Sequence, residues 1–228
     1  MKLAALYSGG KDSTYAIYRA RETGHEVLCL ITLHPAADDS PLLHYPNSWV
    51  TDYHADAMQI PLISLRVSGT AKEDERKALE QAIVQAKEMY CIEGIVYGGI
   101  SSNYQKQAFE GICARQKIAA VAPLWNAEQK KYMTELIDRR FSIIIVGVSA
   151  MGLEKEWLGK QIDRGSLAKL SALSKKYGFN LTFEGGEAET LVIDCPFFRK
   201  KLQINAASTH WDSQRGIFEI RDVSLVEK

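Results

Sequence analysis

The first half of the chain alternates between short apolar runs and longer segments in which apolar residues recur every three or four positions. The short runs are rich in Val, Leu, Ile and Ala and have the length of buried strands. The segments between them have the period of helices with one apolar face, clearest at Leu79, Ile83, Ala86 and Tyr90. The predicted strands are 2–7, 26–33, 62–67, 94–98 and 118–121, and the predicted helices are 12–23, 50–59, 72–90 and 102–115.

This alternation predicts an α/β fold with a doubly wound, parallel sheet of five strands. Ligands of such sheets bind at the carboxyl ends of the strands, next to the point where the strand order reverses. The loop that follows the first strand is therefore the expected place for a ligand site.

The second half has a different pattern and predicts a smaller α+β domain. A strongly apolar strand follows a helix, and the chain ends in two alternating segments joined by a hairpin turn at 213–216. The predicted helices are 128–139 and 166–177, and the predicted strands are 141–148, 201–211 and 217–226. Because Pro123 stops the last strand of the first half, we expect one domain at 1–123 and another at 124–228.

Composition narrows the class of protein. The 228 residues include 28 Lys and Arg and 28 Asp and Glu, so the formal net charge is zero and predicts no general attraction to nucleic acid. No apolar run is long enough to span a membrane or to serve as a signal peptide, which favours a soluble cytoplasmic protein. The four cysteines are far apart and suit neither a zinc site nor a disulfide scaffold. Cys29 and Cys195 lie in apolar runs and are predicted to be buried thiols.

Residues 8–13 read Ser-Gly-Gly-Lys-Asp-Ser and stand between the first strand and the first helix. Gly9 and Gly10 let the backbone approach an anion and are expected to adopt positive φ. The N–H groups of the first helical turn point at the same spot, and the helix dipole adds positive charge there. Lys11 supplies a full charge, and Ser8 and Ser13 supply hydroxyls, so the segment predicts a phosphate cradle.

Two other interpretations of this segment differ in chemistry. The pattern is shorter than the nucleotide loop with four residues between its glycine and its Gly-Lys-Ser/Thr, so a plain γ-phosphate ATPase is not implied. An ordinary strand-to-helix turn, in which Asp12 or Ser13 caps the helix, is the other alternative. The position directly after the first strand favours the phosphate cradle.

A second unusual segment, 184–190, reads Glu-Gly-Gly-Glu-Ala-Glu-Thr. Charge runs of this kind are usually solvated surface loops. Paired glycines, however, indicate special backbone geometry or the close approach of a partner. The segment is therefore a candidate for a second site, in the second domain.

Single polar residues give weaker signals. His34 follows the second strand, where adenine binds in folds of this kind, and contact with the nucleotide is expected. Asn103 starts a helix near the same sheet edge, where it either binds nucleotide or substrate or caps the helix. The remaining histidines have no metal-ligand spacing and are expected to be ordinary surface or hydrogen-bonded side chains. They are His25, His44, His54 and His210.

The order of the motifs resembles a known family. Residues 8–13 resemble the PP-loop of the N-type ATP pyrophosphatases, which holds the β,γ-pyrophosphate while chemistry occurs at the α-phosphate. Four further segments follow in order: Tyr97-Gly98-Gly99-Ile100, Ser102-Asn103-Tyr104-Gln105, Pro123-Leu124-Trp125 and Glu184–Thr190. Together they resemble the diphthine–ammonia ligase family over nearly the whole chain, and the last segment is the specific one.

The resemblance implies an activity. It implies ATP-dependent amidation of diphthine on translation elongation factor 2 to diphthamide, through an acyl adenylate, with release of AMP and pyrophosphate. ATP and Mg²⁺ are the implied cofactors, ammonium and the modified elongation factor are the implied partners, and a homodimer stays open. The first domain would be an ATP-binding domain of the HUP-like type, and the second would bind the substrate.

The resemblance also implies roles for individual residues. Lys11, Asp12 and Glu187 would be catalytic, with Asp12 also near the metal ion. Ammonium needs an anionic seat and a base, and Glu187 or Glu189 is a candidate for this role. The nucleotide-binding set would be Ser8, Gly9, Gly10, Lys11, Asp12, Ser13, His34, Gly98 and Gly99. The substrate-binding set would be Asn103, Tyr104, Trp125, Glu184, Gly185, Gly186, Glu187, Glu189 and Thr190, with carboxylates or aromatic faces for the trimethylammonium group.

Two other functions remain as alternatives. A PP-loop enzyme that modifies tRNA is one, although tRNA thiolases of this type generally need a catalytic cysteine pair, and Cys91 and Cys113 form no such motif. Enzymes that act on RNA also tend to carry a basic domain, whereas this chain is neutral. A non-catalytic module that binds an adenine nucleotide as a signal is the other.

Overall fold

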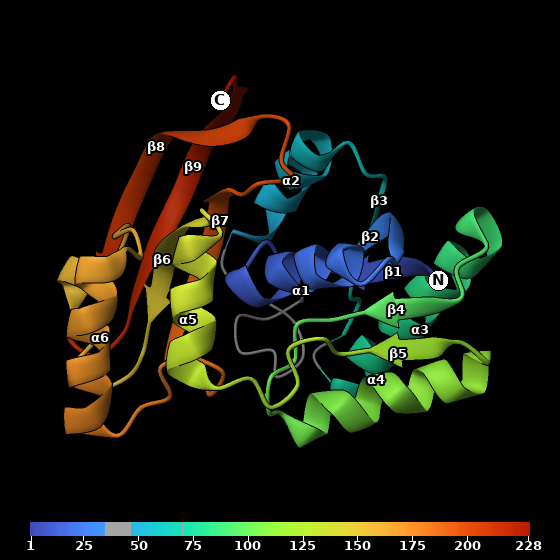
Figure 1. Ribbon diagram of the computed structural model, residues 1–228, viewed down its shortest axis with the longest axis horizontal. Coiled ribbons are helices and arrows are strands. Elements are labelled where there is room, and N and C mark those ends of the chain that lie inside the picture. Colours follow the sequence, from blue (N-terminus) through green and yellow to red (C-terminus); the bar gives the residue numbers. More distant parts are fainter. Residues whose placement is uncertain (35–46, 70) are drawn as a thin grey trace. The chain divides into compact units, whose positions relative to one another are not determined.

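The computed structural model describes residues 1–34, 47–69 and 71–228, and the chain divides into two compact units, Met1–Trp125 and Asn126–Lys228. Figure 1 shows a separate sheet in each unit. The division follows Trp125, whereas the sequence places it after Pro123. His44 lies outside the described residues.

The first unit contains the predicted parallel sheet with helices. Its strands are β1 (Lys2–Leu6), β2 (Glu26–His34), β3 (Leu62–Arg66), β4 (Gly94–Val96) and β5 (Ala119–Val121). They pair in the order β3-β2-β1-β4-β5, and every pair is parallel. The α/β prediction is thus confirmed, and the strand order reverses between β1 and β4.

Helices cover both faces of this sheet. They are α1 (Lys11–Glu22), α2 (Thr51–Met58), α3 (Lys72–Tyr90) and α4 (Asn103–Gln116), with a 3-10 turn, η1, at Ser48–Val50. Right-handed crossovers put α1 and α2 on one face and α3 and α4 on the other, because the chain moves in opposite directions along the sheet before and after β3. The core under α3 and α4 includes Leu79, Ile83 and Ala86, as their helical spacing predicts.

The second unit contains an antiparallel sheet. Its helices are α5 (Gln129–Asp138), the 3-10 turn η2 (Lys155–Trp157) and α6 (Arg164–Tyr177), and its strands are β6 (Ser142–Val148), β7 (Ala188–Asp194), β8 (Lys201–Trp211) and β9 (Gly216–Val226). The strand order is β7-β6-β9-β8. β6 is buried over nearly its whole length, as its apolar sequence predicts. Sequence reasoning missed β7, whose first residues belong to the acidic segment 184–190.

The cysteines are free thiols, and three of them are buried. Burial raises the pKa of Cys29 and of Cys195 to about 12 and that of Cys113 to about 11, while Cys91 is exposed. The prediction that Cys29 and Cys195 are buried thiols is confirmed. Among the described helices, none is long and apolar enough to cross a bilayer.

Candidate functional site

The loop after β1 has the geometry of an anion site. Gly9 has a φ of 80°, which strains any residue with a Cβ, and Gly10 is the N-cap of α1 with an extended backbone, φ −75° and ψ 168°. The expected positive φ is therefore confirmed at Gly9 and wrong at Gly10. No side chain caps α1, so the alternative in which Asp12 or Ser13 is the cap is also wrong. A helix that starts without a side-chain cap offers its first N–H groups to an anion.

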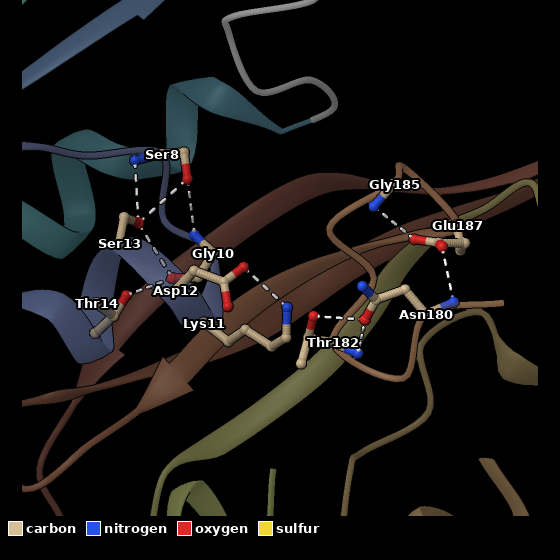
Figure 2. Close-up of polar contacts among 10 residues, drawn as sticks. All are labelled: Ser8, Gly10, Lys11, Asp12, Ser13, Thr14, Asn180, Thr182, Gly185 and Glu187. Carbon is tan, nitrogen blue, oxygen red and sulfur yellow. Dashed lines mark hydrogen bonds and ion pairs between the residues drawn. The ribbon is translucent and has the colours of Figure 1, made fainter. Parts of the chain in front are cut away.

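Hydrogen bonds of hydroxyl groups connect this loop to the first turn of α1. The Ser13 hydroxyl accepts the N–H of Ser8 at 3.3 Å, lies 3.2 Å from the Ser8 hydroxyl, and donates to the Gly10 carbonyl at 3.2 Å. The Thr14 hydroxyl donates to the same carbonyl at 2.8 Å. Figure 2 shows these bonds converging on one turn of backbone. The two serines thus shape the loop, and their hydroxyls already have partners within it.

Lys11 and Asp12 form an ion pair at the start of α1. The Lys11 Nζ lies 2.9 Å from Asp12 Oδ2, and Lys11 is 2% exposed (Figure 2). A buried ammonium needs a counter-charge, and here the neighbouring carboxylate provides it. The described residues contain no cluster of three His, Cys, Asp or Glu side chains suited to a metal ion. Asp12 is the carboxylate of this loop, and it suits a Mg²⁺ that phosphates mainly hold.

The loop after β4 packs closely against the start of α1. A Cβ on Gly98 would lie 2.5 Å from the carbonyl carbon of Asp12 and 2.6 Å from the backbone nitrogen of Ser13. Only glycine allows this approach, which occurs where the strand order reverses. A Cβ on Gly99 would meet the ring of Tyr97 at 3.0 Å. Both glycines therefore have a packing reason, and Gly98 fixes the position of the anion loop.

Two neighbouring residues at the start of α4 have different roles: one caps the helix, and the other is a candidate ligand-binding residue. Ser102 is the N-cap, and its hydroxyl accepts the N–H of Gln105 at 3.4 Å. Asn103 is the first residue of the helix, so the alternative in which Asn103 is the cap is wrong. Asn103 is exposed at the carboxyl edge of the sheet, and its contact with nucleotide or substrate stays a prediction.

His34 is the last residue of β2, and its ring joins three elements. Nδ1 lies 2.9 Å from the Ser48 hydroxyl and Nε2 lies 2.8 Å from the Ser64 hydroxyl. Burial lowers the pKa of His34, Asp52 opposes this shift, and Arg66 adds to it. Both ring nitrogens have partners, so any contact with adenine would use the ring face or the backbone.

The two aromatic candidates for a cation site already face cations of the chain. Lys72 Nζ lies 5.2 Å and the Arg76 guanidinium carbon 5.5 Å from the centre of the Tyr104 ring. Lys106 Nζ lies 4.3 Å from the centre of the Trp125 ring. A trimethylammonium group that approached the same face of either ring would have to displace these side chains.

The acidic segment of the second unit is built around Glu187. Its Oε1 accepts the N–H of Asn180 at 2.9 Å and its Oε2 accepts the N–H of Gly185 at 2.8 Å, as Figure 2 shows. The Asn180 side chain in turn accepts the N–H and the hydroxyl of Thr182 at 2.8 and 2.7 Å. The carboxylate of Glu187 therefore holds the turn together, a role that sequence reasoning did not foresee.

The rest of the segment has less uniform surroundings. Gly186 has a φ of 79°, and a Cβ on Gly185 would lie 2.8 Å from Glu187 Oε1, so the predicted special geometry of the glycine pair is confirmed. Glu184 is half-buried just before the glycines. Glu189 and Thr190 lie in β7, opposite Gly147 and Ile145 of β6, and Thr190 is buried. The three carboxylates thus occupy a turn and a strand.

Known proteins resemble the chain along its length. The family model described as the Diphthamide synthase N-terminal domain matches residues 1–119, and that of the Diphthamide synthase C-terminal domain matches residues 128–226. A Bos taurus protein named diphthine–ammonia ligase is 34% identical over 225 residues, covering 91% of this chain and 84% of that protein. A Schizosaccharomyces pombe protein of the same name is 31% identical over 89% of this chain and 36% of its own length.

A solved structure is also similar. It is a predicted subunit of a tRNA methyltransferase from Methanocaldococcus jannaschii, 14% identical, and the alignment covers 86% of this chain and 97% of that chain. The TM-score is 0.46, and a likeness at this level carries no argument about function.

Proposed function

Since the chain belongs to the diphthamide synthase family, whose curated relatives are enzymes named diphthine–ammonia ligase, we propose that it amidates diphthine on translation elongation factor 2. In this proposal ATP activates the diphthine carboxylate as an acyl adenylate, and ammonia then replaces AMP. The products are diphthamide, AMP and pyrophosphate.

The observation that carries the nucleotide part is the uncapped start of α1 beside a buried lysine. The N–H groups of this turn and the Lys11 ammonium lie together at the carboxyl edge of the sheet. Gly9 adopts a positive φ in this loop, and Gly98 lets the loop after β4 pack directly against the start of α1. Such an arrangement suits a polyphosphate, which carries several negative charges on one face.

The chemistry requires this positive charge. A carboxylate that attacks an α-phosphate brings two anions together, and pyrophosphate leaves with additional charge. Lys11 and the N–H groups of the first turn of α1 offset this repulsion and stabilise the departing group. Mg²⁺ would further neutralise the phosphates when bound, with Asp12 as its protein ligand. Asp12 pairs with Lys11 in the structure, so the phosphates would take over the Lys11 contact.

The second unit would hold the substrate. We assign diphthine binding to the acidic segment. The carboxylates of Glu184 and Glu189 would face the trimethylammonium group, and Gly186 and Thr190 would shape the backbone of the segment around it. Glu187 already accepts two backbone N–H groups, so it acts as a positioning residue for this segment. Within the first unit, we assign Asn103, Tyr104 and Trp125 to substrate contacts and His34 and Gly99 to nucleotide contacts.

The tRNA alternative finds no support in the cysteines. A thiolase nucleophile has to be a thiolate near neutral pH. Burial instead raises the pKa of Cys113 to about 11, and no disulfide joins Cys113 to the exposed Cys91. These properties are those of structural thiols.

One experiment tests the proposed function directly. The protein is incubated with diphthine-bearing elongation factor 2, ATP, Mg²⁺ and ammonium, and the elongation factor is analysed by mass spectrometry. We expect the small mass decrease of carboxylate-to-amide conversion, together with AMP and pyrophosphate. ADP as the main nucleotide product, or an unchanged substrate mass, rejects the proposal.

A further inference from the structure

Three buried polar atoms without partners lie near the starts of α3 and α4. They are Glu75 Oε2, Arg76 Nε and the Tyr104 hydroxyl, and none has a hydrogen-bond partner among the residues that the structure describes. Buried polar atoms are nearly always paired, so each exception calls for an explanation. The unpaired oxygen of Glu75 most needs an explanation, because Glu75 has an acidic side chain and is only 3% exposed.

The position of Glu75 on α3 does not by itself explain its burial. Glu73, Asp74 and Glu75 all lie in the first turn, where the helix dipole favours acids. Glu73 is exposed, and Asp74 accepts the N–H of Ala71 at 3.3 Å. Glu75 instead faces inward, four residues before the core residue Leu79. The dipole contributes less than the burial of an unpaired carboxylate oxygen costs, and Glu75 Oε2 has no partner among residues 1–34, 47–69 and 71–228.

The neighbouring cations do not fill this role. Lys72 and Arg76 both lie against the ring of Tyr104, which belongs to the first turn of α4. Within the described part of the chain, neither forms an ion pair or a hydrogen bond with Glu75. The ring of Tyr104 thus positions both cations, while the Glu75 carboxylate still lacks a donor.

The location connects this cluster with the reaction. Both helices follow parallel strands, so their first turns lie at the carboxyl edge of the sheet, and the helices pack together on one face. α4 follows β4, which neighbours β1 at the reversal of strand order. A ligand held here would lie on the other face of the edge from α1, beside the crevice where a nucleotide would bind.

We propose that Glu75, with the oxygen of Tyr104, forms the binding subsite for ammonium, the second substrate of the proposed reaction. Ammonium is a compact cation with four N–H donors, so it can reach a buried oxygen and neutralise it. A trimethylammonium group has no N–H donor and is much wider. A neutral molecule would leave the carboxylate charge uncompensated. This inference rests on the proposed function and names the side chains that hold its nitrogen source.

The test compares two nitrogen nucleophiles in matched variants. Glu75→Gln removes the buried charge, and Glu73→Gln removes the same charge from an exposed position of the same turn. Each variant and the parent are assayed with diphthine-bearing elongation factor 2, ATP and Mg²⁺. Either ammonium or hydroxylamine is varied, because hydroxylamine is mainly uncharged at neutral pH and captures the acyl adenylate as a hydroxamate. Pyrophosphate exchange without a nucleophile measures adenylation alone.

We expect Glu75→Gln to raise the KM for ammonium about tenfold or more, since a charged hydrogen-bonding partner is lost. Its KM for hydroxylamine and its pyrophosphate exchange should stay within about threefold of the parent, and Glu73→Gln should match the parent throughout. Equal losses with both nucleophiles, or no loss with ammonium, overturn the subsite.

A second variant covers the case in which Glu75→Gln fails to fold, which thermal unfolding would reveal. Tyr104→Phe keeps the ring that Lys72 and Arg76 face and removes only the hydroxyl. A higher KM for ammonium with an unchanged KM for hydroxylamine supports the subsite, and an unchanged KM for ammonium overturns it. A parent protein that shows neither exchange nor amide formation rejects the proposed function, and the subsite with it.

Discussion

The chain contains two loops with paired glycines and acidic neighbours, and they use the pair in different ways. In the loop after β1, Gly9 and Gly10 lead into a helix without a side-chain cap, and the charged side chains at its start are Lys11 and Asp12, which form an ion pair. In the turn before β7, Gly185 and Gly186 make room for the chain's own carboxylate, Glu187, which accepts two backbone N–H groups. One loop is shaped to receive an anion, whereas the other already contains one.

A glycine pair therefore indicates that the backbone lies close to another chemical group, but it does not identify that group as a ligand or as a side chain of the protein. The N-cap residue of α1, Gly10, has no side chain with which to cap the helix, which is a reason to look for a ligand at this end of α1. The donors of Asn180 and Gly185 have a side-chain acceptor, which is a reason to assign Glu187 a positioning role.

The largest effect is expected at the first loop. Lys11→Ala removes the positive charge that would face the phosphates, and adenylation should fall on the order of 10²-fold or more. AMP formation with diphthine-bearing elongation factor 2 is the measurement. Arg19→Ala, at a half-buried position in the last turn of the same helix, is the control and should keep the parental rate. Equal AMP formation in all three proteins would mean that nucleotide binds elsewhere.

The second effect concerns the packing that holds this loop. Gly98→Ala places a Cβ 2.5 Å from the Asp12 backbone, so the loop after β4 must move away from α1. Overpacking of this kind costs about 1–3 kcal/mol of stability. ATP affinity measured by calorimetry should weaken as well.

Gly111→Ala in α4 is the matched control for Gly98→Ala. Its new Cβ has open space, with Arg115 at 3.9 Å. An alanine inside a helix should therefore raise stability by about 0.5–1 kcal/mol. If Gly98→Ala behaves like the control, the close approach of β4 and α1 does not constrain the site.

The third effect tests the internal anion of the second loop. Glu187→Gln keeps one acceptor and replaces the other by an amide donor, which cannot accept a backbone N–H. We expect a loss of about 1–2 kcal/mol in unfolding free energy, with slower amide formation and unchanged ATP affinity. Glu184→Gln and Glu189→Gln should also slow amide formation and leave ATP affinity unchanged. If all three variants ligate at the parental rate, the segment is a solvated loop.

Much of the fold could be predicted because local periodicity and tertiary burial agree. The apolar face of α3 is explicit in the sequence, and its predicted bounds, 72–90, match the structure. β7 was missed because only 191–193 form an apolar run, while its first residues carry the charge of the preceding turn. Pairing with the buried strand β6 makes this segment a strand, and that context is not local.

The candidate site shows the same limit. The sequence predicted the anion loop, but the backbone of Gly10 was wrong because α1 begins one residue earlier than expected, at Lys11. Glu75 was overlooked as one of three acids in a helical turn. Its spacing of four residues from Leu79 places it on the buried face, and this signal was available in the sequence. The partners of Glu187 could not be read, because Asn180 lies seven residues away and contributes its backbone.

The smallest effect is expected at His34. Both nitrogens of its ring lie within hydrogen-bond distance of serine hydroxyls, just as both oxygens of the Glu187 carboxylate accept backbone N–H groups. Burial holds the pKa of His34 below its ordinary value of 6.5, so between its folded pKa and 6.5 the unfolded chain binds more protons than the folded one. Stability should therefore fall as the pH drops below 6.5 and should level off below the folded pKa. In His34→Asn this part of the pH dependence should disappear, with unfolding in urea measured from neutral to mildly acidic pH. Identical slopes in both proteins would show that burial does not favour the neutral ring of His34.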